Sequence, residues 1–133
     1  MHTTTTTVDT TGRTVVDLTD RLREACAGRG DGLVNALAAH ATAGLALMET
    51  GSGSEADLDE VVARLLPRDD RWTHAHGARG HGADHVLPAF VSPSVTLPVV
   101  DGAPALGTWQ RLVLVDHNHD YPRRTVRFSV LEG

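Results

Sequence analysis

The last third of the chain most strongly constrains the fold, because it has the pattern of three β-strands separated by turn residues. The segments Val95–Val100, Gln110–Asp116 and Thr125–Leu131 are rich in β-branched and aliphatic side chains, which favour strands. In the last segment apolar residues at even positions alternate with polar residues at odd positions. We therefore expect one buried and one polar face there.

The earlier part of the chain adds two helix patterns and further strands. Thr19 can cap a helix that runs to about Ala27, after a short strand over Thr14–Leu18. A second helix is predicted from Ser54, with apolar residues at helical spacing until Pro67 ends the pattern. Thr3–Thr7 fits an edge strand or a disordered tail, and β-branching favours the strand.

Two segments carry most of the histidines. Leu33–Leu47 is apolar and fits a buried strand pair, or one long bent strand, with His40 at its middle. Residues 68–82 are polar, glycine-rich and histidine-rich, which indicates a loop that is ordered only if something such as a ligand holds it. A short helix beginning near Ala83 and closing at Phe90 follows. Together these elements predict a compact α+β domain with a mostly antiparallel sheet.

Composition excludes several functions. The chain has 133 residues, which fits one domain, and its net charge of -5 gives no attraction to a phosphate backbone. Nucleic acid is therefore an unlikely partner. The apolar runs are too short to span a membrane, and the start lacks the features of a signal peptide, so we expect a cytoplasmic protein. All 12 basic residues are arginine, which excludes lysine nucleophiles and the Gly-Lys-Ser/Thr phosphate loop. The single cysteine, Cys26, fits a buried helix face.

Five of the eight histidines lie in only two places, which indicates a metal or proton-transfer site. Catalytic zinc typically takes three protein ligands. His40, His74 and His85 can supply that set, with His76 and His81 as substitutes. His81 and His85 have the i, i+4 spacing that places them on one face of a helical turn. An exposed histidine-rich loop explains the pattern equally well. We expect the remaining three to be solvated: His2, His117 and His119.

Other residues are candidates for a pocket. Glu49 follows an apolar run and fits a general base, or equally a solvated carboxylate. Gly107–Gln110 begins a predicted strand and offers a lining for a small polar ligand, although a bulge packed by a core tryptophan explains it too. Arg123 and Arg124 could bind phosphate in bidentate fashion, but most paired arginines at strand ends are solvated. We interpret Trp72 as a packing anchor for the histidine-rich loop.

Several short segments, in this order and spacing, resemble the YjbQ-like family, the secondary thiamine-phosphate synthase enzymes. The resemblance spans nearly the whole chain, 1–133, as a single domain. Its segments are His40–Leu45 leading to Glu49, Trp72–His74, Ala83–His85, Ser94–Val99, Asp101–Gly102, Gly107–Gln110 and Pro122–Arg124.

The resemblance implies a barrel-like antiparallel sheet with two or three helices, a homotrimer, and a site in which histidines gather around a divalent metal. By this resemblance His40, His74 and His85 are the metal ligands. The same resemblance makes Glu49 a candidate acid or base, and Gln110 and Arg124 pocket residues, whereas His76 and His81 have no counterpart in the family pattern.

The family's activity joins hydroxymethylpyrimidine pyrophosphate to thiazole phosphate. The present chain departs from the family pattern at Ala41 and Met48, and Ser52–Gly53 stand where Asp-Pro is usual. One acidic group is therefore missing, which favours zinc over a metal that prefers carboxylate oxygens. Besides the thiamine-phosphate synthase-like transferase, two alternatives stay open: a metal-dependent hydrolase, and a non-catalytic trimeric module that binds a small phosphorylated metabolite.

Overall fold

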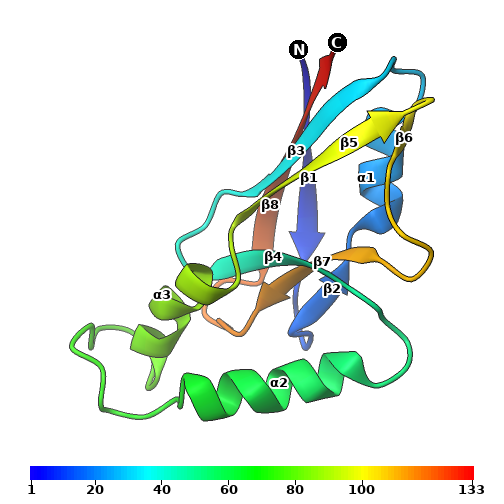
Figure 1. Cartoon of the computed structure of the whole chain (residues 1–133). Coiled ribbons are helices and arrows are strands. Elements are labelled where there is room, and N and C mark those ends of the chain that lie inside the picture. Colours follow the sequence, from blue (N-terminus) through cyan, green and yellow to red (C-terminus); the bar gives the residue numbers. More distant parts are fainter.

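A computed structural model describes residues 1–133 as two antiparallel sheets and three helices (Figure 1). The larger sheet has the strand order β1-β8-β3-β5-β6, and the smaller sheet has the order β2-β7-β4. The sheets curl around a common core as a half-barrel. The strands are β1 (His2–Asp9), β2 (Val15–Asp17), β3 (Gly32–Ala38), β4 (Ala43–Met48), β5 (Ser94–Val100), β6 (Ala103–Pro104), β7 (Arg111–Asp116) and β8 (Arg123–Glu132). The predicted α+β fold is confirmed.

Strand β8 is an interior strand of the larger sheet, because it pairs with β1 on one side and β3 on the other. His2 lies opposite Val130, so the two ends of the chain are neighbours. The even positions of β8, from Arg124 to Val130, are buried, and the odd positions are at least partly exposed. The predicted alternation of this strand is therefore confirmed, and the threonine-rich start is the edge strand β1.

Strand β7 is buried on both faces. Leu112 and Leu114 enter the main core between the sheets, whereas Val113 and Val115 enter a second apolar cluster beneath α2 and α3. A strand covered on both sides has a continuous apolar sequence rather than an alternating one. This explains why β7 reads as an unbroken aliphatic run.

Three helices cover these sheets: α1 (Thr19–Cys26), α2 (Ser54–Leu65) and α3 (His81–Phe90). Helix α1 places Leu22 and Cys26 in the main core, and burial raises the pKa of the Cys26 thiol. Cys26 is thus the small core residue that the sequence predicts. None of the helices is long and apolar enough to cross a membrane.

Of the two alternatives for Leu33–Leu47, the structure has two strands, and His40 lies in the loop that joins them. Two other sequence-based boundaries are corrected. Helix α3 begins at His81, two residues before Ala83. Gly107–Gln110 is a turn rather than the start of a strand, because the Gln110 side-chain carbonyl accepts the Gly107 N–H at 2.8 Å. The tryptophan of this turn is not core, since Trp109 is 72% exposed.

Candidate metal centre

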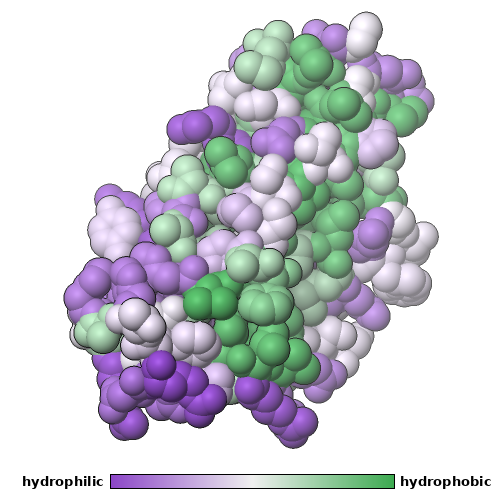
Figure 2. All heavy atoms as spheres, turned by 60° about the vertical axis from the view of Figure 1, so that its left-hand side comes forward, coloured by the Kyte–Doolittle hydropathy of each residue, from purple (hydrophilic) through white to green (hydrophobic).

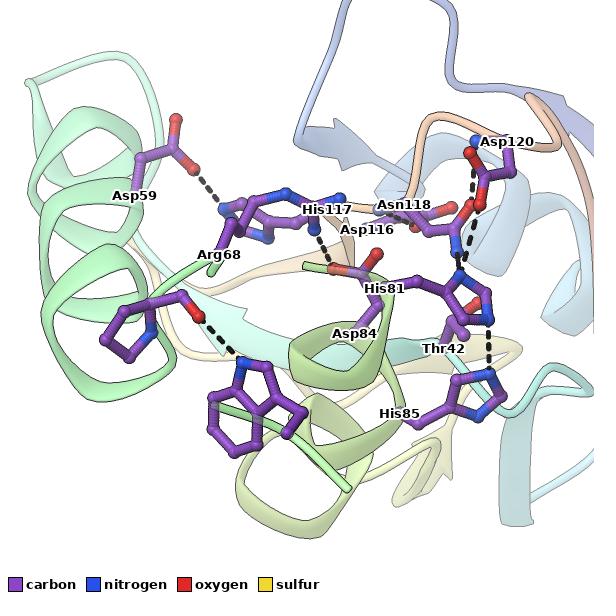
Figure 3. Close-up of polar contacts among 12 residues, drawn as sticks. Thr42, Asp59, Arg68, His81, Asp84, His85, Asp116, His117, Asn118 and Asp120 are labelled. Carbon is purple, nitrogen blue, oxygen red and sulfur yellow. Dashed lines mark hydrogen bonds and ion pairs between the residues drawn. The ribbon is translucent and has the colours of Figure 1, made fainter. Parts of the chain in front are cut away.

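The first turn of α3 forms one half of a histidine cluster. His81 and His85 are four positions apart in the helix, so their side chains share one face. Their Nε2 atoms lie 2.9 Å apart (Figure 3). The helical spacing that the sequence predicts for this pair is confirmed.

The connection between α2 and α3 supplies the third histidine. The Trp72 indole N–H donates to the Pro67 carbonyl at 2.8 Å and anchors the connection. A Cβ atom on Gly82 would lie 2.5 Å from the His74 carbonyl oxygen, so the missing side chain lets this segment approach α3 closely. The His74 ring is then 4.2 Å from the His85 ring, centroid to centroid.

The geometry of the three rings fits a tetrahedral zinc ligand set. One nitrogen from each of His74, His81 and His85 lies within 4.8 Å of the others. Two imidazole nitrogens bound to one zinc ion are about 3.3 Å apart, given a Zn–N distance of about 2.0–2.1 Å and tetrahedral angles. Small side-chain movements therefore suffice to place all three nitrogens around one ion.

His81 also has the outer hydrogen bond that is typical of a metal ligand. Its Nδ1 lies 3.1 Å from Asp120 Oδ2 and 3.2 Å from the Asn118 amide nitrogen (Figure 3). The carboxylate is the stronger partner because its hydrogen bond is charge-assisted. Asp120 therefore holds the proton on Nδ1 and leaves Nε2 free to bind a metal. Asn118 orients Asp120, since its side-chain oxygen accepts the Asp120 N–H at 2.8 Å.

The proximity of these rings favours their uncharged forms. Partial removal from water, followed by the charges of neighbouring histidines, lowers the pKa of His74 and of His85. His76 is one of these neighbours, with its ring centroid 4.1 Å from that of His74. Uncharged imidazoles are the form that binds metals.

His40 does not belong to this group. Its Nε2 accepts the backbone N–H of Thr125 at 2.8 Å, which joins the β3–β4 loop to β8. His81 stands in the cluster where the sequence suggested His40. That hydrogen bond occupies the Nε2 lone pair, and the ligand role of His40 that the family resemblance implies stays a prediction.

The other candidate pocket residues make no hydrogen bond to the three histidines of the cluster. Glu49 is exposed at the end of β4, and Gln110 is exposed in the turn before β7. Arg124 is only 4% exposed, and its guanidinium binds both oxygens of Asp116, at 2.5 and 3.4 Å, and Thr42 Oγ1 at 3.2 Å. Arg124 thus forms an internal ion pair, and its predicted role in a pocket stays a prediction.

Sequence reasoning missed Asp120 and Asn118 as supports of the cluster. Both lie in the loop between β7 and β8, far along the chain from the histidines they contact. The signal that did exist was the spacing of His81 and His85, which identifies them as a pair without any alignment. His117 was also misjudged as solvated, since its Nε2 lies 3.0 Å from Asp59 Oδ1.

A hollow of about 290 Å³ opens beside the cluster. His74 and His81 line it together with glycines and alanines of the connection. Arg79 lies at its edge, 3.5 Å from Asp70 and largely exposed. The hollow can therefore admit a small polar ligand to the histidine nitrogens, with one guanidinium within the same lining.

Fold and cluster together define a class: an α+β protein with a curled antiparallel half-barrel and a histidine-rich site at its edge. A model of the family described as UPF0047 protein YjbQ-like matches residues 3–133. The chain therefore belongs to the YjbQ-like family, as its sequence motifs indicate.

Individual relatives agree with this assignment. A UPF0047 protein of Mycobacterium bovis is 62% identical over 126 residues, covering 95% of this chain and 98% of the relative. The crystal structure of a hypothetical protein from Aeropyrum pernix has a TM-score of 0.91 and 29% identity, and the match covers 100% of both chains. A YbjQ-like protein of unknown function from Sulfolobus solfataricus has the same fold, with a TM-score of 0.90 at 23% identity and coverage of 99% and 97%.

Proposed function

We propose that this protein is a zinc-dependent hydrolase of a small phosphorylated metabolite, with His74, His81 and His85 as the metal ligands. One observation carries the proposal: three histidine nitrogens lie within 4.8 Å of one another. The Asp120 carboxylate, 3.1 Å from His81, supports it by fixing the tautomer of one ligand. Three protein ligands leave a fourth position open, as catalytic zinc sites require.

The residues of the chain divide the chemistry among them. When bound, zinc supplies Lewis acidity that activates water and neutralises a phosphoryl oxygen. His76, beside His74, can take the proton that water loses as it attacks phosphorus. The P–O bond to the leaving group then breaks with its electron pair on oxygen, the alkoxide takes a proton from solvent, and His76 returns its proton to solvent. Arg79 at the edge of the hollow can bind a remaining phosphate oxygen.

The positions of the other predicted residues favour hydrolysis over the synthase reaction. The synthase expectation gives roles to Glu49, Gln110 and Arg124. Glu49 and Gln110 are exposed, and the Arg124 guanidinium is paired with Asp116. A site built from histidines, carboxylates and the exposed guanidinium of Arg79 needs only water as its second reactant.

The homotrimer implied by the family resemblance stays a prediction. Large apolar side chains are exposed on this protein, and Figure 2 shows apolar residues gathered in a band over one face. The exposed large apolar side chains of the whole surface include Leu33, Val61, Leu65, Phe90, Val100, Trp109, Tyr121 and Leu131. Such surface is typical of an interaction site, and light scattering can measure the assembly.

Metal content per chain tests the proposed ligand set. Elemental mass spectrometry on untagged protein is expected to give near-stoichiometric zinc for the wild type. The His40→Gln variant should keep the metal, whereas His81→Asn and His85→Asn should lose it, because each removes one of three ligands. Loss of zinc in His40→Gln with retention in His81→Asn would overturn this set.

Hydrolysis of p-nitrophenyl phosphate tests the reaction class. We expect zinc-dependent release of nitrophenol that disappears in His85→Asn and persists in His40→Gln. A zinc-loaded wild type that releases no more nitrophenol than His85→Asn would contradict the hydrolase while leaving the metal site standing.

A further inference from the structure

A second cavity, of about 200 Å³, lies between α2 and α3. Its walls are mostly aliphatic, with Val62, Ala63 and Leu66 from the α2 side and Ala83 and Leu87 from α3. Helix α3 thus presents different faces to two places: His81 and His85 to the histidine cluster, and Ala83 and Leu87 to this cavity.

Three polar residues complete the lining: Arg68, Asp84 and His117. Asp84 is 2% exposed, and its Oδ1 accepts a hydrogen bond from Arg68 (Figure 3). Its Oδ2 is buried with no hydrogen-bond partner in the chain, and the same holds for Nδ1 of His117. Two residues of this mostly aliphatic lining therefore carry a buried polar atom without a partner.

Both atoms are hydrogen-bond acceptors. Oδ2 of Asp84 is a carboxylate oxygen. The Nε2 of His117 lies 3.0 Å from the Asp59 carboxylate, which offers only acceptors, so Nε2 carries the ring proton and Nδ1 has the lone pair. Burying an acceptor without a donor costs about 1–3 kcal/mol. The cavity therefore favours a ligand that brings at least two donors.

The charges around the cavity indicate that those donors are cationic. The Asp59 and Asp84 carboxylates outnumber the single guanidinium of Arg68, which already binds Asp84. A cavity of about 150 Å³ holds benzene, so this one has room for about eight non-hydrogen atoms by the same measure. A single water, with a share of about 30 Å³ in the liquid, would leave most of the apolar wall uncovered.

We propose that this cavity binds a small hydrophobic primary amine as its ammonium ion. The ammonium N–H groups donate to Asp84 Oδ2 and His117 Nδ1, and the hydrocarbon part packs against the aliphatic walls of α2 and α3. This site is separate from the proposed zinc site, and a bound amine would not touch the histidine nitrogens that face the metal.

The first test compares two probes that share a hydrocarbon part. Benzylamine and benzyl alcohol, with eight non-hydrogen atoms each, are titrated to millimolar concentration into the full chain in the presence of a chelator, and methyl NMR signals are followed. The amine should shift the methyl signals of Val62, Leu66 and Leu87 and leave Val34 of the main core unchanged. Equal binding of the alcohol, or no shift at the cavity methyls, would overturn the proposal.

A pair of variants tests the acceptor directly. Asp84→Asn keeps the shape but replaces one acceptor with a donor, so the affinity for benzylamine should fall about tenfold or more. Asp57→Asn makes the same chemical change at an exposed position of α2 and should bind like the wild type. Unchanged affinity in a folded Asp84→Asn variant would also refute the site. If this variant does not fold, the comparison of the amine with the alcohol still tests the proposal. The chelator keeps both results independent of the zinc proposal.

Discussion

His40 shows how a single histidine can be read in two ways. Its position in a family motif predicts a metal ligand, whereas the structure gives it a hydrogen bond from the Thr125 N–H. Only the ring without a proton on Nε2 can accept that bond. Partial burial and the charge of Arg124 lower the pKa of His40 below 6.5, and the carboxylate of Asp116 does not cancel this effect.

This lowered pKa gives a pH dependence with a definite sign. Below about pH 6.5 this residue is protonated in the unfolded chain more readily than in the folded chain. The unfolded chain then binds more protons, so the free energy of unfolding decreases as the pH is lowered. His40→Gln keeps an acceptor for Thr125 but cannot titrate. As the pH is lowered from about 8 to about 5, the free energy of unfolding measured with urea should therefore decrease less for His40→Gln than for the wild type. The difference in slope corresponds to at most about one bound proton.

The matched control for this experiment is His119→Gln, which removes an exposed histidine. Its pH profile should follow the wild type. Equal slopes for the wild type and His40→Gln would show that the Thr125 hydrogen bond does not depend on the protonation of His40.

At the scale of elements, patterns repeated along the chain were predictable and contacts between distant segments were not. Alternation in β8 and helical spacing in α2 reflect which face is buried, and both elements occur as predicted. The sequence predicted His74 and His85 as members of the cluster and His81 as a substitute, but local spacing accounts only for the pair His81 and His85, which one helical turn brings together. The contact of Asp120 with His81 depends on how the β7–β8 loop packs. The hydrogen bond of His40 to Thr125, apart from the three clustered histidines, depends on how the β3–β4 loop packs. The spacing of residues along the chain predicts neither arrangement.

The close packing of α3 against the segment that contains Trp72 and His74 depends on Gly82. In a free helix, alanine would be favoured over glycine by about 0.5–1 kcal/mol. Here a Cβ would lie 2.4 Å from the Trp72 Cβ and 2.5 Å from the His74 carbonyl oxygen, and overpacking of this kind costs about 1–3 kcal/mol. The clash outweighs the propensity, so Gly82→Ala should lower the free energy of unfolding and push His74 away from His85.

Chemical denaturation and zinc titration of Gly82→Ala measure these two effects. Gly30→Ala is the matched control, because its Cβ would have 3.8 Å to the nearest atom, the Glu132 carboxylate. It should change stability by less than about 0.5 kcal/mol and bind zinc normally. A Gly82→Ala variant that is more stable than the wild type would mean that the connection moves away from α3 at no cost.

At the scale of the whole molecule, the proposed metal would connect segments that lie outside the main core. His74 comes from the α2–α3 connection, His81 and His85 come from α3, and Asp120 extends the set to the β7–β8 loop. The main core between the sheets contains none of them. Zinc therefore stabilises the whole fold only if these segments unfold together with the sheets.

The second apolar cluster indicates that they do. Val113 and Val115 of β7 pack with Val62 of α2 and with Ala83 and Leu87 of α3, so the helices that flank the histidines share a buried surface with the smaller sheet. A ligand at 100 times its Kd that binds only the folded state adds about 2.7 kcal/mol. For a chain of 133 residues, this corresponds to a rise in Tm of about 10 °C.

Thermal unfolding with and without zinc should show that rise in the wild type and in His40→Gln, and none in His85→Asn or after chelation. Hydrogen exchange measured on the same samples separates the alternatives. Slower exchange across β7 as well as α3 follows if helices and sheet unfold as one unit. Protection confined to residues 66–90, with Tm unchanged despite bound zinc, would mean that the histidine-bearing segment opens while the sheets stay folded, and the second apolar cluster would then be too weak to couple them.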